Sequence, residues 1–457
     1  MLLKSVYERF VAESPISVMV HGLLCRALCP DPLDRLFEAT AERQYTKELL
    51  FSTTVDVMAS VVCRIRPSVH AAFQAKKEEI GVTVRALYDK LQCLEPGISS
   101  TLVHHTADEL RAIIAQLKGA RPPLLPGYTV KILDGNHLAS TERRLKVLRD
   151  VAAGPLPGQT LVVLEPETGL AAAVICSEDG HAQERALLGQ IWSEVEKRDV
   201  WIADRNFCTT GFLFALASRG AFFVIRQHKQ SLHWTRQSRR RRLGRTNTGV
   251  LYEQRLWLEN EDGSTLVVRR VTLKLDRPTR DGETEIHLLT NLPATVAAKR
   301  VALLYQGRWS VEHLFQNLTT LLKCEVDTLA YPKAALFGFC VALAASNVLA
   351  TVKAALRAAH PKVAVDDVVS DYYMADELAG TYRGLLIALP GADWEFLTEM
   401  TQNQFVLWLR GVAKGVRWER LRKHPRGPKK PGLKRTRFAR HPHVATARLL
   451  EQGNRKE

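Results

Sequence analysis

The sequence predicts a mixed α/β protein, in which a helical block precedes a core of alternating strands and helices. Within residues 1–120, apolar side chains recur at helical spacing through Leu49–Val62 and Val82–Leu94, and strand-like alternation is scarce. Beyond the Pro- and Gly-containing stretch 121–127, short apolar runs bounded by turn residues take over. With 457 residues, 46% of them hydrophobic and 25% charged, the chain is neither wholly disordered nor a polytopic membrane protein.

The segment after residue 127 gives the most specific fold prediction. Its first three apolar runs have strand character and suit an antiparallel meander, because a Glu-Pro-Glu-Thr-Gly turn joins the second and third. The predicted order is strand, strand, strand, helix, strand, helix, strand, over Tyr128–Asp134, Gln159–Leu164, Leu170–Cys176, Glu184–Lys197, Val200–Asp204, Thr210–Ser218 and Ala221–Ile225. This is the order of a ribonuclease-H-like α/β fold.

The remaining elements complete the predicted architecture. Three strands are expected over Val250–Leu258, Thr265–Leu275 and Glu285–Leu289, with a hairpin turn at Asn260–Gly263. Helical periodicity resumes between Ala294 and Lys323. The expected parts are a helical N-terminal domain (1–120), a ribonuclease-H-like core (125–225 plus 291–355), a β-rich insertion (226–290), a helical C-terminal region (356–413) and a basic tail (414–457), which we expect to be extended.

The net charge of +16 is concentrated in two segments. Residues 414–457 carry +12 and residues 226–245 carry +8, so the rest of the chain is slightly acidic. Such a distribution predicts a polyanionic partner, with solubility or a flexible basic tail as the simpler alternative. The candidate phosphate-binding residues are Arg239, Arg240, Arg241 and Arg242 in the insertion and Lys429 and Lys430 in the tail.

Other sequence features exclude several classes of protein. No Gly-Lys dipeptide occurs, so a phosphate-binding loop for ATP is not expected. The eight cysteines include no Cys-x-x-Cys pair, which favours reduced thiols in a cytoplasmic protein. The charged N-terminus does not resemble a secretory signal. Residues Ala334–Val352 are uncharged and long enough to span a bilayer, but they stand alone and contain polar residues, so we expect a buried core helix.

Three acidic residues are the candidate catalytic groups. Asp134 and Asp204 each end an apolar strand, where a carboxylate is either a turn cap or a group paired with a partner or a metal ion. Glu312 shares a helical face with Tyr305 and Arg308 at spacings of three and four residues. The simpler alternative for that face is a surface ion pair. An Arg fork could instead hold a phosphate while the Glu holds metal.

These residues together resemble a known family. Asp134-Gly-Asn, Asp204-Arg-Asn-Phe, Leu288–Pro293 and Tyr305-x2-Arg308-Trp-x2-Glu312 resemble the DDE transposases of bacterial insertion sequences. The similar subgroup has a Tyr-x2-Arg-x3-Glu-x6-Lys signature and is often called the insertion-sequence-four family. The resemblance covers about residues 125–350.

One signature position departs from that pattern. The signature Lys falls at Thr319, and the nearest cation on that helical face is Lys323. We expect Lys323 either to substitute for the missing Lys or to leave the DNA contact unmade.

The resemblance implies a metal-dependent reaction on double-stranded DNA. Asp134, Asp204 and Glu312 would hold two Mg²⁺ ions, with Mn²⁺ as a substitute, for cleavage at element ends and transfer of the 3′-hydroxyl into target DNA. Tyr305 and Arg308 would position the DNA backbone, and a homodimer would join two ends. An insertion aromatic, Trp257 or Trp234, would receive a flipped base, unless it belongs to the core or a hairpin.

Two further functions remain open from the sequence. A structure-selective ribonuclease-H-like nuclease would use the same three acids without strand transfer. A catalytically silent, domesticated DNA-binding protein is the other, and Thr319 leaves room for it.

Overall fold

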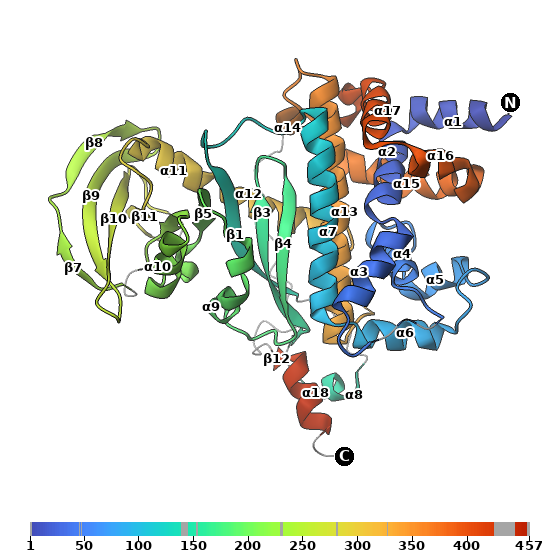
Figure 1. Cartoon of the computed structure of the whole chain (residues 1–457), viewed down its shortest axis with the longest axis horizontal. Helices are drawn as coiled ribbons and strands as arrows, with labels where there is room; N and C mark the ends of the chain where they lie inside the picture. Colours follow the sequence, from blue (N-terminus) through green and yellow to red (C-terminus); the bar gives the residue numbers. More distant parts are fainter. Residues whose placement is uncertain are drawn as a thin grey trace.

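The computed structural model describes residues 2–44, 46, 48–138, 145–151, 154–228, 232–279, 282–326, 328–424 and 444–454. Figure 1 shows one large sheet that passes through the centre of the molecule, with the long helices α7 and α13 lying side by side against it. The other N-terminal helices and the helices within residues 371–414 gather on the far side of these two helices, whereas the last helix, within residues 446–454, lies apart from them.

The N-terminal block is helical, as the sequence predicts. Local capping explains several boundaries: the Ser68 and Thr83 hydroxyls each accept a backbone N–H at the first turn of the helix that follows. The helices are α1 (Leu2–Glu13), α2 (Pro15–Ala27), α3 (Pro30–Thr40), α4 (Phe51–Val62), α5 (Val69–Ala75), α6 (Val84–Cys93) and α7 (Pro96–Leu117).

Ten strands of the described chain form one mixed sheet, in the order β4-β3-β1-β5-β6-β11-β10-β9-β7 with β8 paired to β9. β3 is antiparallel to β1 and β4 is antiparallel to β3, whereas β5 and β6 run parallel to β1 and to each other. The mixed sheet fits a ribonuclease-H-like core. The core strands are β1 (Thr129–Leu138), β3 (Gly158–Glu165), β4 (Leu170–Ser177), β5 (Asp199–Ala203) and β6 (Phe222–Arg226).

The predicted insertion extends the same sheet. β11 pairs antiparallel with β6, and β10, β9 and β7 continue outward from it. The expected hairpin turn is confirmed, because the Gly263 amide donates to the Asn260 carbonyl and Gly263 has a φ of +79°. Two strands in the basic run were not predicted. The strands are β7 (Trp234–Gln237), β8 (Arg241–Thr246), β9 (Gly249–Glu259), β10 (Thr265–Leu275) and β11 (Glu285–Thr290).

Helices cover both faces of the sheet. One face packs on α7, α13 and the helical block, and the other packs on α9 (Glu184–Leu187) and α10 (Thr210–Ser218). Side chains alternate between these faces along β5, where Ile202 joins the first core and Trp201 the second. The later helices are α11 (Ala298–Gln306), α12 (Trp309–Thr320), α13 (Pro332–Ala359), α14 (Val365–Val368), α15 (Asp371–Ala388), α16 (Glu395–Glu399) and α17 (Gln402–Lys414).

The buried helix predicted after residue 333 is confirmed as α13. In the part of the chain that the structure describes, α13 is the only helix long and apolar enough to cross a membrane, but 89% of its most apolar window is buried. Its buried Asn347 accepts from the amide and donates to the carbonyl of Ala171 in β4, at 2.7 and 3.0 Å. Ala171 is in register with Leu164 of β3 on one side, and Asn347 satisfies its backbone groups on the open edge of β4.

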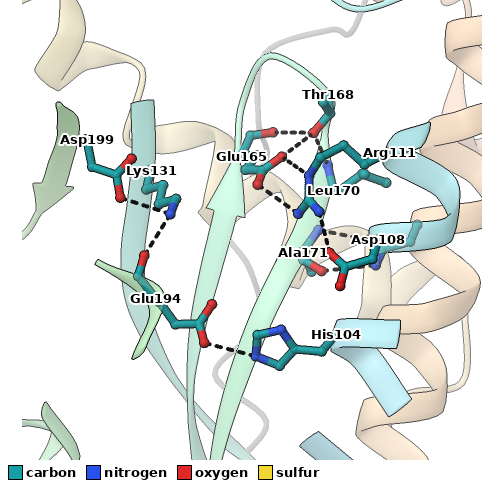
Figure 2. A network of polar contacts seen from close by, with 11 residues as sticks. His104, Asp108, Arg111, Lys131, Glu165, Thr168, Leu170, Ala171, Glu194 and Asp199 are labelled. Atoms are coloured by element: carbon teal, nitrogen blue, oxygen red, sulfur yellow. Dashed lines mark hydrogen bonds and ion pairs between the residues drawn. The ribbon is translucent and has the colours of Figure 1, made fainter. Parts of the chain in front are cut away.

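A polar network ties α7 to the sheet (Figure 2). The Lys131 amine lies 2.9 Å from the Asp199 carboxylate and donates to the Glu194 carbonyl. The Glu194 carboxylate lies 3.1 Å from the His104 ring on α7, and this hydrogen bond raises the pKa of His104. These contacts fix the starts of β1 and β5 relative to the helical block.

The expected length of the helix after β4 is wrong. The helix expected over Glu184–Lys197 is short: α9 ends at Leu187, and two 3₁₀ turns, η1 (Leu188–Gln190) and η2 (Trp192–Glu194), follow. Leu187, Leu188 and Ile191 all pack into the second core from these turns, so their apolar spacing reflects burial rather than a continuous helix.

The tail is not extended throughout. Trp418–Leu421 form the 3₁₀ turn η5, and residues 444–454 form β12 (Val444–Ala445) and α18 (Thr446–Asn454). β12 pairs in parallel with β2 (Pro155–Leu156), and α18 packs against α8 (Lys146–Arg149). The Arg448 guanidinium donates twice to Asp179, at 2.6 and 3.0 Å. This C-terminal segment therefore docks on the core.

Candidate active site

The strand register brings the two candidate aspartates together. β1 and β5 are parallel neighbours, and Leu133 of β1 pairs with Ala203 of β5. Asp134 and Asp204 are the next residues, so they lie at the same level on adjacent chain segments, about 4.8 Å apart in the backbone. Asp204 follows the end of β5, whereas β1 continues to Leu138, so the expectation that Asp134 ends its strand is wrong. Asp134 shares the face of Ile132, which is the face that α12 covers.

Arg308 joins the first acid to the third. Its guanidinium donates to Asp134 at 2.7 Å and to Glu312 at 2.5 Å. Arg308 and Asp134 are largely buried, with 13% and 15% of their side chains exposed, whereas Glu312 is 37% exposed. The simple surface ion pair considered from the sequence is therefore part of a larger, partly buried arrangement.

The expected single helix around these residues is divided in two. α11 ends at Gln306 and α12 begins at Trp309, with Gly307 and Arg308 between them in helical backbone conformation. Helical spacing survives across the break, so Arg308 and Glu312 still lie on one face. Tyr305 on α11 is held near Arg308, and burial raises the pKa of its phenol.

The ionised form of Asp134 is unfavourable in its buried position. Burial raises the pKa of Asp134 to about 6; Arg308 opposes this effect, and the charges of Asp204 and Glu184 add to it. When the ionised form of a carboxylate remains unfavourable despite one bound guanidinium, further positive charge nearby would stabilise it. An additional cation beside Asp134 would therefore lower its pKa.

The donor set fits a hard divalent cation only in part. Three carboxylates supply oxygen ligands, which Mg²⁺ prefers, and two of them are adjacent in register. Within the described ranges, however, no group of three or more His, Cys, Asp or Glu residues is arranged to hold a metal ion. The reason is visible locally: the Arg308 guanidinium bridges Asp134 and Glu312. Asp134 and Asp204 are thus the part of the site that fits a divalent cation.

Several residues beside the acids were not identified from the sequence. Asp204 accepts from the Asn206 amide at 2.7 Å, and the Asn206 side chain donates to Glu184 at 3.3 Å. Burial raises the pKa of Glu184; Asn206 opposes this effect, and the Asp204 charge adds to it. Asn206 lies within the Asp-Arg-Asn-Phe motif, which was its only signal. Glu184 lies in a four-residue helix and has no periodic signal.

Two arginines extend positive charge along the carboxyl ends of the strands. Arg226 ends β6, and Arg205 follows Asp204 directly. Both pair with Glu283 of the insertion. This pairing connects the insertion to the edge of the candidate site.

Lys323 does not point along the face of Glu312. It follows the end of α12, and its amine donates to the Pro67 carbonyl in the loop after α4 at 2.9 Å. The Thr319 hydroxyl donates to the Phe315 carbonyl of its own helix. Arg64, from the same loop as Pro67, donates to the Thr320 carbonyl at the end of α12. The structure thus uses Lys323 to hold the N-terminal block against α12.

The insertion arginines lie on its exposed β7–β8 side. Arg240 donates twice to Glu285, at 2.9 and 3.2 Å, and Arg241 lies 3.7 Å from Glu253. Arg239 and Arg242 are exposed to solvent. Lys429 and Lys430 lie outside the described residues.

The two insertion tryptophans are half-buried and stack with arginines. Arg236 lies over Trp257 at 4.8 Å and Arg270 over Trp234 at 5.7 Å. Neither ring is brought to the three acids by any of the contacts described above, so a role for either in binding a base stays a prediction.

Comparison with known proteins supports one family. The Putative transposase y4zB of Sinorhizobium fredii is 33% identical over 132 residues, which cover 28% of this chain and 35% of that protein. The match thus spans about a third of the relative's length. A family model described as a transposase DDE domain matches residues 159–348, a segment that contains Asp204 and Glu312 and begins after Asp134. Over that segment the chain is similar to the transposase DDE domain, and together the two matches support a DDE transposase.

Proposed function

We propose that the chain is a DNA transposase of the Tyr-Arg-Glu-Lys signature subgroup, which cleaves DNA at the ends of an insertion sequence and transfers the 3′-hydroxyl into target DNA. The observation that carries the proposal is the register of β1 and β5, which sets Asp134 beside Asp204. Arg308 connects this pair to Glu312. The transposase DDE domain match gives independent support.

Each residue has a role in the proposed reaction. Asp134, Asp204 and Glu312 bind divalent metal, Mg²⁺ or Mn²⁺, which when bound activates the attacking oxygen and stabilises the leaving one. Arg308 releases a carboxylate and takes a DNA phosphate through its planar donors. Tyr305 lies near Arg308 and helps to position the same stretch of DNA backbone.

The wider proposal concerns DNA and the assembly. Double-stranded DNA lies along the insertion arginines, and the helical N-terminal block recognises the element ends. Two protomers pair the two ends, and the reaction needs no ATP. We propose a cytoplasmic location, where thiols stay reduced; the eight cysteines, all within the described residues, form no disulfide bond.

A strand-transfer assay separates this function from the nuclease alternative. Purified protein is incubated with Mg²⁺, a supercoiled plasmid and a pre-cut duplex that carries the DNA flanking the gene and ends in a 3′-hydroxyl. A transposase joins the duplex to the plasmid. Hydrolysis without joined product would favour a structure-selective nuclease.

A silent DNA-binding protein is the second candidate, and one observation favours it. Arg308 already pairs with two of the three acids, and Lys323 is engaged with Pro67 rather than available near Thr319. Calorimetric titration with Mn²⁺ distinguishes the two: a transposase binds the ion and Asp134→Ala weakens that binding. A silent protein binds DNA but takes up no ion.

The tail contributes phosphate contacts in this proposal. Residues 425–443 carry seven Lys or Arg and no acid. Because residues 444–454 dock on the core, deletion of the whole tail would remove structure as well as charge. Replacing the seven cations by Gln should lower the slope of log binding constant against log salt by about 0.9 per lost phosphate contact. An unchanged slope would remove the tail from the DNA interface.

A further inference from the structure

Asn206 is held at three points beside the second aspartate. Its backbone amide donates to Asp204 at 2.7 Å, and its side chain donates to Glu184 at 3.3 Å. Its carbonyl accepts from the Arg185 guanidinium at 2.5 Å. Glu184 and Arg185 both begin α9, so this short helix fixes the turn that carries Asp204.

The same Glu184 lies against the residue that follows the first aspartate. A Cβ built on Gly135 would collide with the Glu184 carboxylate. The neighbours of Gly135 explain this contact: Asp134 points to the face that α12 covers, so Gly135 turns its open side to the opposite face, where α9 packs. The absence of a side chain on Gly135 therefore leaves room for the Glu184 carboxylate in this position.

One side chain thus contacts the supports of both aspartates. Glu184 reaches Asp204 through Asn206 and reaches Asp134 through Gly135. Because catalytic groups lose efficiency when they shift by fractions of an ångström, a shared support matters for a reaction that uses both carboxylates. The two motifs carry a Gly and an Asn at the positions that Glu184 contacts.

We propose that Glu184 is a positioning residue, which links the β1 segment that carries Asp134 to the turn that carries Asp204, through Gly135 and Asn206. This inference rests on the proposed function for its catalytic consequence. The structural link from Glu184 to the two aspartate-bearing segments does not depend on the proposed function. The required feature is a side-chain oxygen of glutamate length that accepts from Asn206, so Gln at this position should serve and Ala should not.

The test compares Glu184→Ala, Glu184→Gln, Asn206→Ala and the double variant Glu184→Ala/Asn206→Ala with the wild-type chain. Glu178→Ala is the matched control, because Glu178 is a half-buried acid six residues before Glu184 that pairs with Lys333 at 4.0 Å. Cleavage rates are measured with Mg²⁺. Backbone hydrogen exchange is measured by mass spectrometry on peptides that cover residues 133–138 and 204–208, without DNA.

The expected results are specific. Glu184→Ala and Asn206→Ala each slow cleavage about 10- to 100-fold, and the double variant is no slower than the slower single variant. Glu184→Gln and Glu178→Ala stay within a few-fold of wild type. Exchange in both peptides accelerates in Glu184→Ala but not in Glu184→Gln.

The outcomes separate this inference from the proposed function. If the wild-type chain does not cleave DNA, the proposed function fails, and the exchange data alone decide whether the link exists. If exchange in both peptides is unchanged in Glu184→Ala, the link is wrong. If Glu184→Gln cleaves as slowly as Glu184→Ala, the charge acts instead, and the positioning role is overturned.

Discussion

Replacing Asp134 by Asn should stabilise the metal-free protein at neutral pH while it removes a proposed catalytic group. Burial raises the pKa of Asp134 from 3.8 to about 6, and Arg308 only partly opposes this effect. A raised carboxyl pKa means that the folded state binds the proton more tightly than the unfolded state does. The contribution to stability is therefore fully present below pH 3.8 and is lost as pH rises through about 6.

The magnitude follows from the same shift. A difference of about two pKa units corresponds to about 3 kcal/mol at pH values above 6. Asn imitates the protonated carboxyl, so Asp134→Asn should raise the free energy of unfolding by up to about 3 kcal/mol at pH 7.5 and by little at pH 4. The corresponding increase in melting temperature is several degrees.

The assay is thermal unfolding with EDTA across pH 4–8. Because Asn before Gly135 deamidates readily, intact-mass measurement checks that the amide persists. Asp366→Asn is a control of opposite sign: burial opposes ionisation of Asp366, but Arg121 and Arg357 outweigh it and lower its pKa. That variant should lose stability at pH 7.5. Equal stability of Asp134→Asn and wild type at pH 7.5 would refute the strained-acid reasoning.

Three other substitutions test the frame around the site. Asn347→Ala leaves buried backbone groups of the edge strand β4 without partners and should lower the free energy of unfolding by about 2–4 kcal/mol, measured with urea; a loss under 1 kcal/mol would contradict the edge role. Lys131→Met leaves Asp199 buried and unpaired, so a loss of about 3–5 kcal/mol is expected, and most of it should return in Lys131→Met/Asp199→Leu. Arg448→Gln should accelerate proteolytic removal of the C-terminal segment, and an unchanged digestion rate would mean that the Arg448 contact with Asp179 does not hold it.

The sequence identified the aspartates because each follows an apolar run of strand character, a local pattern, although β1 continues past Asp134 to Leu138. Asp134 and Asp204 follow alternating or wholly buried runs, and parallel strands end at one edge of a sheet. Glu312 was found through its spacing from Arg308, which survives the break between α11 and α12. Each of these predictions depended on sequence patterns within ten residues of the acid.

The parts that escaped prediction depend on contacts between distant segments. Glu184 meets Gly135 only because α9 packs on the opposite face of β1, and no local pattern encodes that approach. The salt bridge from Arg308 to Asp134 spans 174 residues. Lys323 was expected either to substitute for the signature Lys or to leave the DNA contact unmade, and the packing of the N-terminal block directs its amine to Pro67.

Unpredicted secondary structure has a similar cause. β7 and β8 lie in a basic run with little apolar alternation, and they form because β9 offers a free edge. The turns after Leu187 replace a helix because burial in the second core determines their conformation. Local propensity therefore gave the elements of the core, and tertiary packing decided the remainder.

The most direct test of the central claim is Mg²⁺-dependent cleavage of element-end DNA by Asp134→Ala, with Glu178→Ala as the matched control. Alanine cannot revert to aspartate by deamidation, and circular dichroism checks that the variant is folded. The account predicts that cleavage falls below detection in the Asp134 variant and stays near the wild-type rate in the control. Cleavage by a folded Asp134→Ala protein at the wild-type rate would contradict the assignment of the site.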